Sequence, residues 1–177
     1  MAQPALHTWT DGAPLRLAAK TVSRNDPDPM ALACYGRLLR FGNDAPEEVW
    51  LRFVDGRPVS AITTQFLAWC CDRLAGQGIT TLVLIGDNAG WHVSHAVRRW
   101  LCAHNRRAHR AGGVRIVPCL LPTKSPWRNA IEPKWVHGQR RIAEPARLLT
   151  APALEERVCA AFACPLENHL VMLPEVA

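Results

Sequence analysis

Two acidic residues, Asp87 and Glu132, stand where the chain would hold a carboxylate rigidly and partly exposed. Asp87 directly follows the apolar run 80–85, which we expect to be a strand, so its side chain would lie at the end of a sheet. Glu132 precedes Pro133, and proline is tolerated at the first position of a helix. Carboxylates placed in this way can bind a hard cation or accept a proton. Each also has a plain structural reading, Asp87-Asn88 as a turn or helix cap and Glu132 as a charge that stabilises a helix N-terminus.

The segments around these acids predict an α/β fold. The patterns indicate strands over 30–41, 49–54, 80–85 and 114–121, a short strand within 15–22, and helices over about 60–75, 93–106, from 133 onward and over 151–163. In an α/β sheet the carboxyl ends of neighbouring parallel strands share one edge, so Glu132 can fold back near Asp87.

Finer features of these segments can also be predicted. The run 80–85 is continuously apolar, which is typical of a strand buried on both faces. Ser60 and Thr150 are expected to cap their helices, because short hydroxyl side chains accept hydrogen bonds from the first free amides. The arginine-rich segment 105–113 is expected to be a surface hairpin or loop.

Composition fits one ordinary globular domain. The chain has 177 residues, 49% of them apolar and 20% charged, and no apolar run is long enough to span a membrane. No basic leader precedes an apolar stretch, so we expect a cytoplasmic protein. The seven cysteines show no zinc-knuckle spacing, and we expect them to be buried thiols rather than a disulfide framework.

Positive charge is concentrated in one part of the chain. Residues 98–147 hold twelve Lys or Arg and two acids, 12 − 2 = +10, whereas the whole chain carries +6. Such a basic field attracts polyanions, nucleic acids among them. A merely soluble basic surface would have the same composition.

Taken together, the acidic motifs resemble a known family. Asp87-Asn88 has His92 five residues after the Asp, and the second motif contains Ser125-Pro-Trp, Asn129 and the run 131–138, Ile-Glu-Pro-Lys-Trp-Val-His-Gly. This pattern is similar to the catalytic core of mariner-like DDE transposases, and more closely to their bacterial insertion-sequence relatives. The similarity extends over most of the chain, from His7 into the tail.

The resemblance implies a ribonuclease H-like mixed sheet with flanking helices, formed by a partial catalytic domain over 1–147 and a C-terminal helical tail of the same domain over 148–177. It implies an endonuclease and strand transferase in which three carboxylates hold two Mg²⁺ (or Mn²⁺) ions, with Asp87 the second acid and Glu132 the third. The expected partner is double-stranded DNA, at element ends and target, and the full-length form is expected to be a homodimer. The supporting residues would be Asn88, His92 and Asn129, and the DNA-binding residues Arg98, Arg99, Lys124, Arg128, Lys134, Arg140 and Arg141.

The chain also departs from this pattern. The family's first catalytic Asp lies on a strand that precedes the stretch resembling 2–9, so we expect that central strand, and the helix-turn-helix region before it, to be missing. Less telling differences are Gly90, Arg128 and Ala130, where the family commonly has Ser, an apolar residue and Pro. Four other N-terminal acids lie in turns or loops and are not expected to replace the first Asp: Asp11, Asp26, Asp28 and Asp44. We therefore expect weak Mg²⁺ binding, no catalysis and poor folding of the chain alone.

Two other functions fit parts of the sequence. A non-catalytic nucleic-acid-binding module would use the same basic residues together with Arg106, Arg107 and Arg110, and its DNA binding would survive loss of both acids. A zinc protein would draw on His92, His95, Cys102, His104, His109 or Cys119, whose spacings match no common ligand pattern. The tryptophans beside the acidic motifs could stack on bases or pack around the site: Trp91, Trp127 and Trp135.

Overall fold

The structure is a computed structural model that describes residues 7–10, 13–16, 32–42, 45–56, 59–122, 125, 128–142 and 149–172. These residues form a mixed α/β fold, as the sequence predicts. The chain divides into two compact units, the first formed by residues 1–53 and 133–168 and the second by 54–132 and 169–177. The division into a catalytic part over 1–147 and a tail over 148–177 stays a prediction.

The first unit holds two pairs of strands and two helices. β1 (His7–Thr10) and β2 (Ala13–Arg16) form an antiparallel hairpin. The sequence predicts a strand over 15–22, which β2 overlaps at its start, and residues 17–22 lie outside the described residues. β3 (Ala33–Leu39) pairs with β4 (Glu48–Asp55), in agreement with the predicted strands 30–41 and 49–54.

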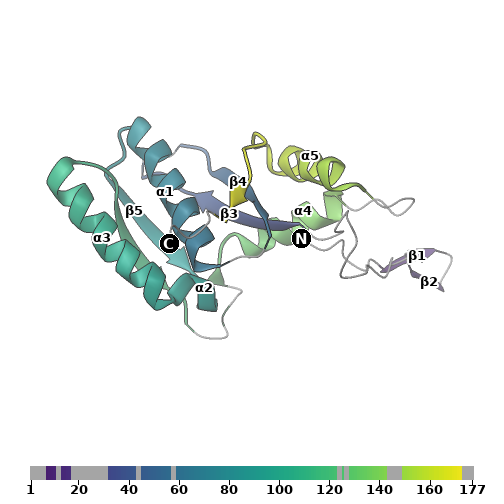
Figure 1. The fold of residues 1–177 in the computed structure, drawn as a ribbon. Coiled ribbons are helices and arrows are strands. Elements are labelled where there is room, and N and C mark those ends of the chain that lie inside the picture. Colours follow the sequence, from purple (N-terminus) through teal and green to yellow (C-terminus); the bar gives the residue numbers. More distant parts are fainter. Residues whose placement is uncertain are drawn as a thin grey trace. The chain divides into compact units, whose positions relative to one another are not determined.

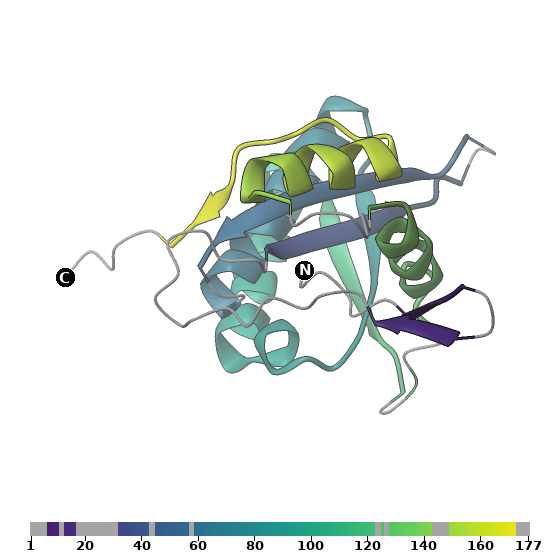
Figure 2. The ribbon, with the colours of Figure 1, turned by 90° about the vertical axis from the view of Figure 1, so that its right-hand side faces the viewer.

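Helices α4 (Glu132–Ile142) and α5 (Ala151–Phe162) complete the first unit's core. Leu51 and Phe53 of β4 pack with Ile142, Leu154 and Val158, all of them buried. Figure 2 shows α5 running alongside β4. The predicted cap is confirmed, because the Thr150 side chain accepts a hydrogen bond from the Ala153 amide at 3.4 Å.

The second unit is built on two parallel strands and the helices beside them (Figure 1). Along the chain it contains α1 (Ser60–Gly76), β5 (Thr81–Gly86), α2 (Gly90–Val93), α3 (His95–Ala111), β6 (Arg115–Leu120) and β7 (Leu170–Val171). Gly86 stands opposite Leu120 in the register, so the carboxyl ends of β5 and β6 lie at one edge. β7 pairs in parallel with the last two residues of β4.

One face of the β5–β6 pair is buried and the other is not. Leu82 and Ile116, which lie opposite each other, are 8% and 1% exposed, whereas Val83 and Ile85 are 57% and 56% exposed. The prediction that 80–85 is buried on both faces is therefore wrong. Side chains alternate between the faces of a strand, and α3, which contacts β6 and also α1, covers one face.

The prediction of a loop over 105–113 is also wrong, because α3 continues to Ala111. The helix ends at two glycines with positive φ, Gly112 at 76° and Gly113 at 136°. The continuation has a physical cause. The Asn105 amide donates to the Ile116 carbonyl oxygen and accepts from the Ile116 amide, both at 2.8 Å. His104 Nε2 contacts the Val114 carbonyl oxygen at 2.9 Å. These contacts fasten the second half of the helix to β6.

Ser60 does not cap α1, contrary to the prediction. Val59 is the N-cap residue, and Ser60 is the first helical residue. The Ser60 hydroxyl donates instead to the Ser94 hydroxyl oxygen at 2.7 Å, and Ser94 caps α3 by accepting from the Val97 amide at 3.2 Å. A hydroxyl pair thus joins the starts of α1 and α3.

The cysteines only partly follow the prediction of buried thiols. All seven are free, but Cys102 and Cys119 are exposed. Among the helices that the structure describes, none combines the length and the apolar character that crossing a membrane would require.

Candidate active site

Asp87 is the first residue after β5, at the edge where β5 and β6 both end. Its Oδ1 accepts a hydrogen bond from the Ala89 amide at 3.0 Å and another from His92 Nδ1 at 2.7 Å. The first contact is the turn that an Asp-Asn sequence commonly forms. Both contacts converge on one oxygen, and within the described part of the chain no donor contacts Oδ2. The structural alternative, in which Asp87 forms a turn, is therefore correct for Oδ1. It leaves Oδ2 available for a ligand.

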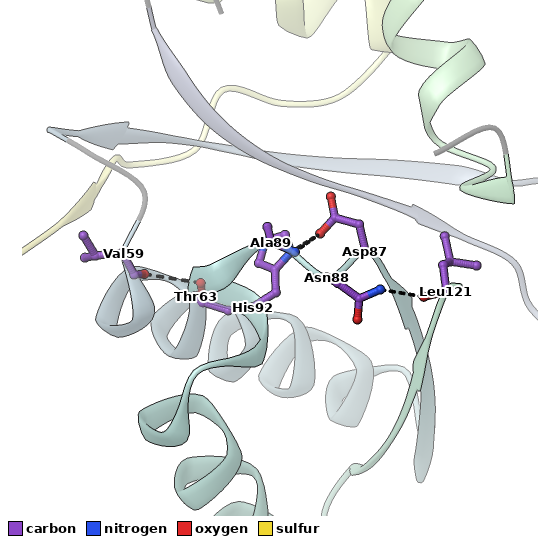
Figure 3. A network of polar contacts seen from close by, with 7 residues as sticks. All are labelled: Val59, Thr63, Asp87, Asn88, Ala89, His92 and Leu121. Carbon is purple, nitrogen blue, oxygen red and sulfur yellow. Dashed lines mark hydrogen bonds and ion pairs between the residues drawn. The ribbon is translucent and has the colours of Figure 1, made fainter. Parts of the chain in front are cut away.

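Asn88 fastens the two strand ends to each other. Its Nδ2 donates to the Leu121 carbonyl oxygen at 2.6 Å, and the Leu121 amide donates to the Gly86 carbonyl oxygen at 2.9 Å. Figure 3 shows the Asp87 and Asn88 side chains leaving the end of β5 in different directions, Asn88 toward Leu121. These two hydrogen bonds therefore fix the backbone on both sides of Asp87.

His92 is placed by the short helix α2. Its amide donates to the Ala89 carbonyl oxygen at 2.8 Å, which closes the first turn of α2, directly after the turn at Asp87. The side chain of His92 is 33% exposed and that of Asp87 is 49% exposed. Because a carboxylate can only accept, the short contact fixes the proton of the imidazole on Nδ1.

Glu132 is the first residue of α4, and its amide donates to the Asn129 carbonyl oxygen at 3.0 Å. Burial raises the pKa of Glu132, and the negative charge of Asp87 raises it further. The second cause requires the two carboxyl groups to lie within electrostatic reach of each other. The charge of Asp87 therefore acts on Glu132, although the two acids are 132 − 87 = 45 residues apart in the sequence.

This pair fits a hard divalent cation. It supplies carboxylate oxygens, which are the ligands Mg²⁺ prefers, and two repelling negative charges that a cation would neutralise. Among the described residues no group of three His, Cys, Asp or Glu is arranged to hold a metal ion. The four acids that the sequence does not favour as a third ligand lie outside the described residues: Asp11, Asp26, Asp28 and Asp44.

The residues considered for zinc have other contacts or positions. His92 bonds to Asp87, and His104 bonds to a backbone carbonyl and stacks on Trp100 with ring centroids 4.9 Å apart. His95, His109, Cys102 and Cys119 are exposed. Of the tryptophans, Trp91 is 41% exposed, Trp135 packs edge-on against Phe162, and Trp127 lies outside the described residues.

The basic residues predicted to bind DNA are distributed over both units. Arg98, Arg99 and Arg128 are exposed in the second unit, and Arg140 and Arg141 are exposed in the first. Lys134 forms an ion pair with Glu47 at 3.1 Å, and Lys124 lies outside the described residues.

Sequence reasoning missed the main-chain groups that hold the site. The Ala89 amide and the Leu121 carbonyl oxygen fix Asp87 and Asn88, but neither side chain marks that role. The position of Ala89, two residues after an Asp, is the one signal that could have indicated the first contact.

Comparison with known proteins adds a family to this geometry. The family model described as DDE superfamily endonuclease matches residues 46–155, a range that includes both Asp87 and Glu132. No curated protein and no solved structure matches the chain significantly.

Proposed function

This chain belongs to the DDE superfamily endonucleases, and we propose that it is the catalytic part of a DNA transposase of the mariner-like, insertion-sequence type. Membership implies a nucleic-acid substrate, and endonucleases of this superfamily typically use a divalent metal ion. In the proposal the substrate is double-stranded DNA, at element ends and target, and the reactions are phosphodiester cleavage and strand transfer.

The observation that carries the proposal is the position of Asp87 at the shared end of the parallel strands β5 and β6, within a family match that also contains Glu132. The negative charge of Asp87 also raises the pKa of Glu132, which supports a common site. Asp87 and Glu132 would be the second and third carboxylates of the metal-binding triad. His92 and the Ala89 amide hold Oδ1 of Asp87, so that Oδ2 remains for the metal. Asn88 keeps the ends of β5 and β6 in register, and the backbone oxygen of Asn129 positions the start of α4.

Mg²⁺ bound by these carboxylates would activate a water or a 3′-hydroxyl and stabilise the leaving oxygen of the phosphodiester. The chain's own contribution is to fix two oxygen ligands on rigid elements before the metal arrives. Exposed arginines on either side of Glu132 in the sequence, Arg128, Arg140 and Arg141, together with Arg98, Arg99, Lys124 and Lys134, would contact DNA phosphates.

The proposal extends to a ribonuclease H-like sheet. Among the described strands β5 pairs with β6 alone, so its other edge would accept the central strand that carries the first Asp. With two of three carboxylates, the 177-residue chain would bind Mg²⁺ weakly and would not cleave DNA by itself. The active form would be a homodimer.

A nicking assay tests the proposal. Supercoiled plasmid incubated with the purified 177-residue chain and Mg²⁺ is expected to stay intact. An extended protein, translated in frame from DNA upstream of the Met1 codon and containing a strand that ends in Asp, is expected to nick it. Asp87→Asn or Glu132→Gln in the extended protein should abolish nicking. Nicking that survives either substitution would overturn the proposal.

The second candidate function is a non-catalytic, basic nucleic-acid-binding module, favoured by the exposed arginines of α3. It predicts salt-dependent DNA binding and no Mg²⁺-dependent cleavage by any form of the protein. The same nicking assay on the extended protein separates the two functions.

A further inference from the structure

Three of the chain's free thiols lie close together in the first unit: Cys34, Cys159 and Cys164. Cys34 of β3 and Cys164 both pack against the buried cluster that contains Cys159. Burial raises the pKa of Cys34 to about 12, and the thiolate charges of Cys159 and Cys164 raise it further. The three sulfur atoms therefore share one largely apolar environment, and none of them takes part in the Asp87–Glu132 pair.

The end of helix α5 brings Cys159 and Cys164 together. Ala163, at the end of α5, has φ 51° and ψ 42°, and it is the one residue other than glycine with positive φ among the described residues. The chain turns back there, so that the Ala163 amide donates to the Ala160 carbonyl oxygen at 3.3 Å and the Cys164 amide to the Cys159 carbonyl oxygen at 3.0 Å. These two hydrogen bonds form a Schellman motif, in which the side chains at the positions of Cys159 and Cys164 commonly touch.

The two thiols also contact each other. The Cys164 thiol hydrogen-bonds to the Cys159 sulfur, and the Cys159 thiol donates to the Pro165 carbonyl oxygen at 3.7 Å. Burial raises the pKa of Cys159, and it raises the pKa of Cys164 to about 12. Both side chains are therefore neutral thiols near pH 7, held with their sulfur atoms side by side.

We propose that Cys159 and Cys164 are a reversible disulfide site, oxidised by a small-molecule disulfide such as glutathione disulfide. The Cys164 sulfur attacks one sulfur of the reagent, whose S–S bond breaks, and one small thiol leaves. The Cys159 sulfur then attacks the Cys164 sulfur of this mixed disulfide and displaces the second small thiol. The two protein thiols give up two protons and two electrons in all, and the reagent takes them up as it becomes two thiols.

Burial sets the order of the two steps. Cys159 is 6% exposed, whereas Cys164 is half-buried between the exposed residues Ala163 and Pro165. A reagent from solution therefore reaches Cys164 first, and Cys159 completes the disulfide from inside. Because the thiolate is the attacking form, a pKa of about 12 makes the reaction slow at neutral pH. Its rate should rise about tenfold for each pH unit between about pH 7 and pH 9.

The modification would act on the packing between α5 and α4. Phe162, which lies between the two cysteines in the sequence, packs edge-on against Trp135 of α4 with ring centroids 5.0 Å apart. It also lies directly beside Gly138 of the same helix. A disulfide across the end of α5 would fix the turn that carries this contact.

Peptide mapping by mass spectrometry tests the inference. No Lys or Arg follows Arg157, so trypsin leaves both cysteines in the single peptide 158–177. The folded chain is incubated with glutathione disulfide, and the remaining thiols are blocked with iodoacetamide. Peptide 158–177 should become lighter by two hydrogens and carry no blocking group, and dithiothreitol should reverse the change. The peptide that contains Cys34 should be blocked as a free thiol.

Three comparisons control the result. Cys34→Ser should still give the lighter peptide, whereas Cys164→Ser should not. Cys102 and Cys119, which contact no other thiol among the described residues, should carry only bound glutathione. At one fixed ratio of glutathione disulfide to glutathione, the ratio of disulfide to dithiol should be at least about tenfold higher in the folded chain than in concentrated urea, because the fold holds the two sulfurs together.

Three outcomes would overturn the inference. Cys159 and Cys164 could both stay blocked as free thiols, which would leave an inert apolar contact at the helix end. Cys34 could be joined to either of them, which would place the disulfide elsewhere in the cluster. The lighter peptide could form equally well in urea, which would mean that the fold does not prepare the pair.

Discussion

Replacement of His92 tests how the chain prepares Asp87 for a metal ion. His92 Nδ1 donates to Asp87 Oδ1 at 2.7 Å, and the only other donor to that carboxylate in the described residues is the Ala89 amide. In His92→Ala the carboxylate keeps one of its two anchors and regains rotational freedom. Its metal-binding oxygen would then be correctly placed for only part of the time.

The expected loss of stability in His92→Ala depends on how far the His92 and Asp87 side chains are exposed. A hydrogen bond to a charged group contributes about 1.5–3 kcal/mol when buried. Here the side chains are 33% and 49% exposed. Exposed ion pairs contribute about 0.2–1 kcal/mol, so we expect His92→Ala to lower the melting temperature by less than about 4 °C. Loss of a residue that orients a ligand commonly weakens metal binding by 10–100-fold, and the remaining amide favours the lower end, about tenfold.

The assay is Mn²⁺ binding, followed by the electron paramagnetic resonance signal of the free ion. His92→Asn is the conservative variant, because the Asn amide nitrogen can occupy the place of Nδ1, and it should recover most of the affinity. His95→Ala, at an exposed position on α3, is the control and should bind Mn²⁺ like the parent. Equal affinities of His92→Ala and the parent would refute the positioning role.

Three further predictions concern the structure around the site. Asn105→Ala leaves the amide and carbonyl of buried Ile116 without their side-chain partners, so urea denaturation should show a loss of about 2–4 kcal/mol; an unchanged midpoint would contradict the role of Asn105 in holding α3. Gly138→Ala gains about 1 kcal/mol of helix propensity, but its Cβ would lie 2.5 Å from Phe162 Cζ, and overpacking costs about 1–3 kcal/mol. The variant should therefore be less stable than the parent and Phe162→Leu should reverse the loss, whereas a more stable single variant would contradict the close contact. The raised pKa of Glu132 means that stability is lost as pH rises from its ordinary value of 4.5 through the raised one, so Glu132→Gln should melt higher than the parent near pH 7 and equally near about pH 4. A pH-independent difference in melting temperature would refute that linkage.

Much of the second unit could be predicted from the sequence because its signals are local. The apolar run before Asp87 and the run after Gly113 specify strands, and their parallel pairing follows from the helix between them. Thr150 caps α5 as expected because the cap needs only its own helix. These features depend on residues that are neighbours in sequence.

The errors have a different origin, since each depends on contacts between distant residues. The segment 105–113 resembles a loop by composition, but Asn105 binds Ile116 and the helix continues until Gly112 allows it to end. Ser60 resembles a cap, but its hydroxyl finds Ser94. An apolar run such as 80–85 does not reveal that helices cover only one of its faces.

Part of the site could be predicted from the sequence because its residues are neighbours in the chain. Asp87, His92 and Asn88 lie within six residues, so their motif is visible in the sequence, although the direction of each hydrogen bond is not. The coupling of Glu132 to Asp87 depends on the register of β5 and β6 and on the loop that leads to α4. Sequence reasoning could expect the two acids to approach each other, from the shared edge of parallel strands and from the family resemblance, but it could not give the register.

The central claim is that Asp87 and Glu132 together hold one divalent cation, and Mn²⁺ binding by the 177-residue chain tests it most directly. The parent chain should bind one Mn²⁺ with a dissociation constant of roughly millimolar size, displaced by Mg²⁺. Asp87→Asn and Glu132→Gln should each abolish binding, and the double variant should be no worse than either. A parent chain that binds no Mn²⁺, or single variants that bind it as tightly as the parent, would contradict the claim.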